Sequence, residues 1–128
     1  MSCPVCGGRT VSFAVPAALR SHAPESGADA ALCTTCLRTV PADGSDDASL
    51  DAVAPAFPTG EAGAALALAL GHLDSLALER DAIDDCCSYA ERAGTDALLT
   101  LDRLADEPDV DPHFDIDRRR PQLAEMLE

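Results

Sequence analysis

The sequence predicts an α+β protein, in which a small N-terminal four-cysteine zinc ribbon of three short strands precedes an acidic α-helical hairpin. Three observations predict this fold class. Two CxxC pairs lie near the N-terminus, short alternating segments surround them, and apolar residues recur at helical spacing after residue 59. The length, 128 residues, suits one domain or two very small ones.

The two pairs occur in "CPVCGG" and "LCTTCLR", and they supply the candidate metal ligands Cys3, Cys6, Cys33 and Cys36. Two such pairs close a tetrahedral site of four sulfurs, which zinc favours and which leaves no open position for catalysis. We therefore expect one structural Zn²⁺.

Three other interpretations of the cysteines are weaker. A redox CxxC follows a strand, and Cys3 is too close to the N-terminus for that; two disulfides do not suit a reducing cytosol. An iron site resembling that of a rubredoxin would need a compact aromatic core, and Phe13 is the only Phe, Tyr or Trp in residues 1–41. His22 could replace a cysteine, but four cysteines are already present.

The two turns differ in their turn chemistry. In the first, Pro4 presets φ and Gly7 supplies the position of positive φ just past the pair. Thr34 and Leu37 occupy the corresponding positions of the second. We therefore expect the second turn to be less ideal.

The segments around the cysteines predict the ribbon itself, over residues 1–41. "RTVSFAVP" alternates, with Val11, Phe13 and Val15 on one face, and "DAALC" and "LRTVP" flank the second pair as two more short strands. A unit of this size is too small to be stable through apolar burial alone, so the metal should supply much of its folding free energy.

A Pro-, Asp- and Ala-rich segment without periodicity follows, and we expect a linker over 42–58. The acidic helical region, 59–128, should begin with a long helix over about 60–93, with Thr59 at its N-cap and Gly94 just past its end. Its apolar stripe is Ala62, Leu66, Ala69, Leu73, Leu76, Ile83, Cys87 and Ala90. A break near Gly71 or around Glu79–Asp81 is the alternative.

Two shorter helices should complete the chain. One is expected over about 96–106, capped by Thr95, and a C-terminal one over about 121–127, with Pro121 in its first turn. Of the adjacent Cys86 and Cys87, we expect one small buried apolar residue and one half-exposed thiol.

The charge is strongly negative, since 23 acidic residues oppose nine arginines and no lysine, for a net charge of −14. Residues 1–40 carry three arginines against two acids, and residues 41–128 carry six against 21. Because carboxylates hold hydration when molar salt screens charge, this composition predicts the cytoplasm of a halophile. "MSCPVC" is not a signal peptide, and the longest apolar run, about ten residues, is shorter than the roughly 20 of a membrane span.

"CPVCGG", "LCTTCLRTVP" and "GTDALLTLDRLADEPDVDPHFDIDRRRPQL" together resemble small haloarchaeal zinc-ribbon proteins of an uncharacterised family. The resemblance covers nearly the whole chain. It implies a haloarchaeal source and a conserved metal site at the same four cysteines, and it implies no activity.

The chain lacks a Ser–His–Asp arrangement, a Gly-rich phosphate loop and an HExxH motif, so we do not expect an enzyme. The sequence favours a non-catalytic zinc-ribbon interaction or adaptor protein, or a small regulator. A protein partner or self-association would cover the apolar helix stripe. Nucleic-acid binding, in transcription or translation, is the alternative. We expect the arginines of 118–120 to pair within the chain rather than to bind phosphate.

Overall fold

The computed structural model describes residues 2–44, 50–55 and 57–127. Its strands are β1 (Thr10–Ala14), β2 (Asp29–Cys33) and β3 (Thr39–Pro41), and its helices are α1 (Gly60–His72), α2 (Arg80–Arg92), α3 (Ala97–Ala105) and α4 (Ile116–Leu127). A small antiparallel sheet with four close cysteines is followed by helices, so the α+β class is confirmed.

The sheet has the order β1-β2-β3, with both pairs antiparallel. Thr10 lies opposite Cys33, so the register places the start of β1 beside a candidate ligand. Val11, Phe13 and Val15 are buried, as their alternation predicts. One face of the sheet therefore packs inward.

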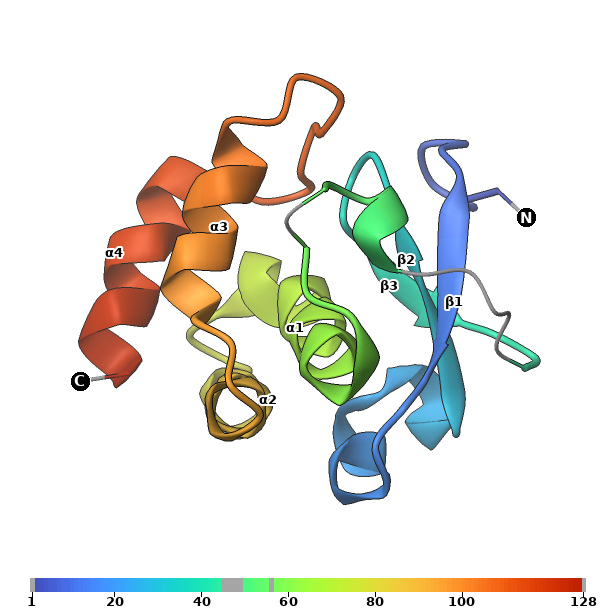
Figure 1. Ribbon diagram of the computed structural model, residues 1–128, viewed down its shortest axis with the longest axis horizontal. Coiled ribbons are helices and arrows are strands. Elements are labelled where there is room, and N and C mark those ends of the chain that lie inside the picture. Colours follow the sequence, from blue (N-terminus) through green and yellow to red (C-terminus); the bar gives the residue numbers. More distant parts are fainter. Residues whose placement is uncertain (1, 45–49, 56, 128) are drawn as a thin grey trace.

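Helix α1 lies between the sheet and the other helices (Figure 1). Residues 62–70 are all buried, as expected of a helix that is apolar on every side. Gly71 is the point where β3 meets this helix, because a Cβ there would lie 2.8 Å from the Cβ of Thr39. The Thr39 hydroxyl donates to the carbonyl oxygen of Ala67, which fixes the sheet to the helix.

The single helix expected over 60–93 is wrong, and the alternative with breaks is correct. Helix α1 ends at His72, a short 3₁₀ turn follows, and α2 begins at Arg80. The N–H groups of Leu78 and Glu79 both donate to the carbonyl oxygen of Ser75, closing the turn. The apolar period continues through this turn, which is why the pattern alone suggests one helix.

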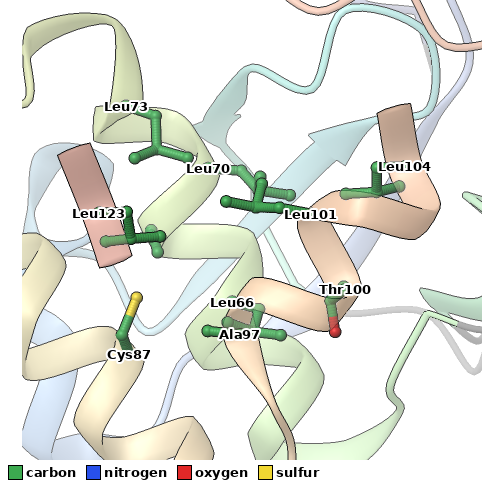
Figure 2. A pocket seen from close by; sticks show the side chains of 10 residues that line it. Leu66, Leu70, Leu73, Cys87, Ala97, Thr100, Leu101, Leu104 and Leu123 are labelled. Carbon is green, nitrogen blue, oxygen red and sulfur yellow. The ribbon is translucent and has the colours of Figure 1, made fainter. Parts of the chain in front are cut away.

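The turn folds the apolar stripe back on itself. Leu66 and Leu73 line one small cavity together with Cys87 of α2, and Figure 2 shows these side chains around it. The larger members of the stripe are all buried: Leu66, Leu73, Leu76, Ile83 and Cys87. The chain thus covers the stripe whose exposure had suggested self-association.

Side chains from the ribbon, the expected linker and the helices share one hydrophobic core. The described part of the linker contributes Leu50, Val53, Ala54 and Phe57, all buried; residues 45–49 and 56 lie outside the described residues. A 3₁₀ turn at Leu50–Ala52 and a hydrogen bond from the N–H of Phe57 to the carbonyl of Ala54 shape this segment. Such geometry has neither a strand nor a helix period, so the sequence pattern did not reveal it.

The end of α2 follows the expectation. Gly94 has φ of +97°, its N–H donates to Glu91, and the N–H of Thr95 donates to Ala90, which is a Schellman motif. The cap of α3 differs from the expected Thr95, since the carboxylate of Asp96 accepts from the N–H of Leu99 at 3.1 Å. At α1, Thr59 holds the N-cap position without a side-chain hydrogen bond.

Helix α4 begins at Ile116, five residues before the expected start at 121. The carboxylate of Asp115 accepts from the N–H of Arg118 at 3.2 Å and so starts the helix earlier. Pro121 lies inside the helix and is exposed, as is Asp117, whose carbonyl receives no N–H from the proline four residues later. Across the described residues, no helix combines the length and the apolarity needed to cross a membrane.

Candidate metal centre

The structure brings the four predicted ligands together. Their Sγ atoms all lie within 4.8 Å of one another: Cys3, Cys6, Cys33 and Cys36. The first two come from the N-terminal turn, which a bridge between Ser2 and Arg9 closes. The other two come from the end of β2 and the turn after it. We call residues 3–8 the first knuckle and residues 33–38 the second knuckle.

The two knuckles have the same backbone hydrogen bonds. In each, the N–H of the first cysteine donates to the carbonyl five residues later, and the N–H of the residue after the second cysteine donates back to the first. The pairs are Cys3 with Gly8 at 2.7 Å and Gly7 with Cys3 at 2.9 Å, then Cys33 with Arg38 at 2.9 Å and Leu37 with Cys33 at 3.2 Å. The second knuckle is therefore formed as fully as the first.

The expectation of a less ideal second turn is wrong because Leu37 takes the glycine conformation. Its φ is +63°, beside +78° at Gly7. A left-handed residue with a Cβ costs roughly 1–2 kcal/mol. The Leu37 side chain is 0% exposed within the shared core, and burial of a leucine is worth roughly 2 kcal/mol. Core packing thus offsets the strain.

Backbone N–H groups point at the sulfurs. Those of Thr35 and Cys36 lie 3.4 Å from the Sγ of Cys33, and that of Gly8 lies 3.4 Å from the Sγ of Cys6. Gly8 has no room for a side chain, since a Cβ would lie 2.8 Å from Thr35 Oγ1 and 3.0 Å from Cys33 Sγ. The close approach of the knuckles therefore depends on this second glycine.

The four thiols lie in unequal environments. Cys3, Cys33 and Cys36 are buried, whereas Cys6 is exposed. Burial raises the pKa of Cys33 to about 12 and also raises the pKa of Cys36. Burial acts in the same direction on Cys3, but N–H donation from Cys6 and Val5 and further hydrogen bonds lower its pKa to about 7. A metal must displace a proton from the deepest thiol.

A positive charge accompanies the sulfurs. A side-chain hydrogen bond with Cys36 raises the pKa of the Arg38 guanidinium. Four thiolates around a divalent cation leave a charge of −2, which this guanidinium partly offsets.

The loop between α3 and α4 holds the second knuckle from outside. The N–H of Asp111 donates to the carbonyl of Thr35 at 2.7 Å, and the N–H of His113 donates to the carbonyl of Cys36 at 2.8 Å. The His113 ring extends the link, since its Nε2–H donates to the carbonyl of Leu70 in α1 at 3.1 Å. The sequence carries no signal for these contacts, because the donors in the first two are backbone groups that every residue except proline has.

The donor set fits a tetrahedral metal. A Zn–S bond of about 2.3 Å implies sulfurs separated by roughly 3.8 Å. The Cys3 and Cys36 sulfurs are 3.8 Å apart, and those of Cys6 and Cys33 are 3.4 Å apart. Within the described residues, no other group of three or more candidate side chains lies close enough to hold a metal ion.

The remaining candidate residues lie away from this centre. Cys86 and Cys87 are both buried on α2, so the half-exposed thiol expected of the pair is absent, and burial raises the pKa of each to about 12. His22 donates to Asp85 at 2.9 Å, and His72 donates to the carbonyl of His22 at 2.8 Å. These histidines connect the ribbon to the helices.

Two of the three arginines of 118–120 have partners within the chain, and one of these partners is a carboxylate. Arg120 donates twice to the carboxylate of Asp102, at 3.0 and 3.2 Å. Arg119 donates to Gln122 and to the carbonyl of Asp74.

Together, the ribbon, its four clustered thiols and the helices packed on it define a small α+β protein with a four-cysteine site able to hold a metal ion. Within that class, the chain belongs to a family of unknown function (DUF6276), whose model matches residues 2–127. No curated protein and no solved structure matches it.

Proposed function

We propose that this protein is a non-catalytic, zinc-stabilised interaction protein, an adaptor or small regulator of a halophile cytoplasm. The convergence of four cysteine sulfurs on one point carries the proposal. A metal held by four protein thiolates has no vacant position for a substrate or a water molecule. Its contribution is to join the two knuckles, and through Leu37 and the 106–115 loop to stabilise the shared core.

Zinc suits the site better than iron does. Both metals accept four thiolates, so the surroundings decide. A buried aromatic cluster beside the site would favour the rubredoxin type. Here Phe13 belongs to the shared core, and the cluster at the site contains Cys3, Cys33 and Cys36.

The metal content tests this assignment directly. Purified protein should contain one zinc per chain by elemental analysis and should be colourless. Cys33→Ser should lose the metal, whereas the matched variant Cys86→Ser, at an equally buried thiol outside the site, should retain it. Visible absorption bands of an iron–thiolate centre, or zinc retained in full by Cys33→Ser, would contradict the proposal.

The partner surface should lie outside the apolar stripe, which the chain itself buries. Among the described residues, the first knuckle exposes an apolar side chain next to the metal centre, Val5, at 63%. We infer that a protein partner contacts this knuckle. The acidic, lysine-free composition supports binding in molar salt, where long-range attraction to nucleic acid is largely screened.

An affinity capture in molar KCl separates the two classes of partner. The wild type should retain a protein that survives nuclease treatment, and Val5→Asp should lose it while keeping its zinc. Leu78→Asp is the matched control, because Leu78 is 87% exposed on the turn between α1 and α2. Co-purification of nucleic acid instead, abolished by nuclease, would support the alternative of a nucleic-acid-binding ribbon.

A further inference from the structure

We propose that Cys6 is a peroxide-reactive thiol and that Cys33 is its resolving partner, so that oxidation joins the two knuckles by a disulfide. The inference rests on the proposed metal centre for its setting. It assigns the centre a second chemistry, in which hydrogen peroxide or a related hydroperoxide is the reactant.

Accessibility selects the first thiol. Cys6 is exposed, whereas Cys3, Cys33 and Cys36 are no more than 4% exposed. Its neighbours Pro4 and Val5 are exposed as well, so the whole tip of the first knuckle faces solvent. Because this residue is exposed, a small oxidant can approach it without any opening of the fold. Oxidation follows exposure and thiolate character, and a thiol bound to a metal is a thiolate.

Geometry selects the second thiol. The Sγ of Cys33 lies 3.4 Å from that of Cys6, and the Cys3 and Cys36 sulfurs are 3.8 Å apart. Both short contacts cross from one knuckle to the other. Burial alone would keep Cys33 protonated, so its attacking thiolate is the form that the metal holds, and the N–H groups of Thr35 and Cys36 point at its sulfur.

The chemistry balances in two steps. The Cys6 thiolate attacks hydrogen peroxide, an S–O bond forms, the O–O bond breaks, and hydroxide leaves. The Cys33 thiolate then attacks the Cys6 sulfur, the S–S bond forms, the S–O bond breaks, and a second hydroxide leaves. The two sulfurs together lose two electrons and the peroxide gains them. Two of the four ligands are then unavailable, so the metal is released.

The chain carries its own internal control. Cys86 and Cys87 are buried on α2 outside the four-cysteine cluster, so no metal holds them as thiolates, and burial raises the pKa of each to about 12. They should stay reduced while the knuckles react.

Peptide mapping tests the proposal, because arginines separate the relevant cysteines. Trypsin cleaves after Arg9, Arg20 and Arg38, so the knuckles leave on the separate peptides 1–9 and 21–38, and the α2 pair leaves on 81–92. Zinc-loaded protein is treated with hydrogen peroxide, free thiols are alkylated, and the digest is analysed by mass spectrometry. A metal indicator follows zinc release in parallel.

The expected product is peptide 1–9 joined to peptide 21–38, with fragment ions placing the bond between Cys6 and Cys33. Zinc should leave in proportion, dithiothreitol should reverse the link, and peptide 81–92 should oxidise at least about tenfold more slowly. Cys33→Ser should lack the metal, so it is compared with metal-free wild type; there its peptide 1–9 should progress to the sulfinic acid at Cys6. Cys86→Ser should react like the wild type.

A disulfide within one knuckle, oxidation at Cys86 before Cys6, or no reaction at any knuckle thiol would overturn the proposal. Its failure is distinct from that of the proposed function, because the zinc content is measured before oxidation. If the zinc-loaded protein forms no cross-link, the proposed disulfide is contradicted and the proposed structural zinc is not. If the purified protein holds no metal but forms the cross-link, the result would support the proposed disulfide and contradict the proposed structural zinc.

Discussion

The first and second knuckles share their hydrogen bonds and differ in what surrounds them. The first stands at the surface, where Pro4, Val5 and Cys6 are exposed. The second continues from the central strand β2, and its Leu37 enters the hydrophobic core. Tertiary packing holds one half of the site in place, and turn chemistry forms the other.

This difference shows that one backbone geometry can be reached by two physical routes. Gly7 adopts positive φ at little steric cost, so the first knuckle forms from local sequence. The second holds Leu37 in the same region because the core fixes its side chain. The second half should therefore be rigid before the metal binds, and the first should complete the site around the ion.

Removing one ligand from each knuckle should give the largest difference in stability between the two knuckles. Cys33→Ser leaves a buried hydroxyl in β2, and burying a polar group in place of a thiol costs about 1–3 kcal/mol beyond the lost metal. Cys6→Ser places its hydroxyl in water. Urea unfolding should thus show Cys33→Ser less stable than Cys6→Ser by that amount. Equal losses would mean that the two halves are alike.

Replacing each of the two residues of positive φ should show how each knuckle is stabilised. Leu37→Gly relieves the strain but empties a core site, for a net loss of roughly 2 kcal/mol. Gly7→Ala has open space for its Cβ and should lose about 1 kcal/mol through the backbone alone. Chemical unfolding of the zinc-loaded variants measures both. A more stable Leu37→Gly would show that packing does not hold the second turn.

Metal removal should loosen the 106–115 loop together with the second knuckle. The amides of Asp111 and His113 donate to the carbonyls of Thr35 and Cys36. Chelation should speed their hydrogen exchange about tenfold or more, which corresponds to about 1.4 kcal/mol of lost protection. The amide of Ile83, which donates to the carbonyl of Glu79 at the start of α2, is the control. Unchanged hydrogen exchange at the Asp111 amide would show that the loop does not depend on the metal for its stability.

The smallest expected effect is a change in how zinc affinity depends on pH. Protons compete with the metal, so affinity falls as pH falls. Burial raises the pKa of Cys33 to about 12, so this thiol must release its proton at every pH near neutrality. The pKa of Cys3 is about 7, so its proton adds to the competition only below that value. A competition titration should show the slope of log affinity steepen by about one proton below pH 7.

A constant slope from pH 6 to pH 9 would contradict this assignment. Cys3→Ser should remove the steepening even though it weakens binding.

Local signals predicted the ligands and the strands. The four cysteines, the alternation through Val11 and Phe13, and Gly94 each act over a few residues, so the sequence alone locates them. The sequence favours one helix through residues 73–79, with a break near Gly71 or around Glu79–Asp81 as the alternative, because apolar residues continue through this turn at helical spacing. The start of α4 was misplaced for a similar reason, since Pro121 gave a stronger signal than the cap at Asp115.

Features that depend on distant parts of the chain could not be predicted. Leu37 is tolerated in its left-handed conformation because a core assembled from three regions surrounds it. The buried residues Leu50 and Phe57 lie in a segment without a helix or strand period. The donors from Asp111 and His113 are backbone groups, which carry no residue-specific signal.

The 106–115 loop also has a consequence for synthesis on the ribosome. A nascent chain has all four thiols once Cys36 has emerged, so it can take up a metal early. The backbone groups of Asp111 and His113 that hold the second knuckle emerge roughly 75 residues later. At typical elongation rates of about 5–20 residues per second, several seconds separate the two events. During that interval the metal is held by an unsupported ribbon, and its lifetime there depends on how quickly the C-terminal part of the chain follows.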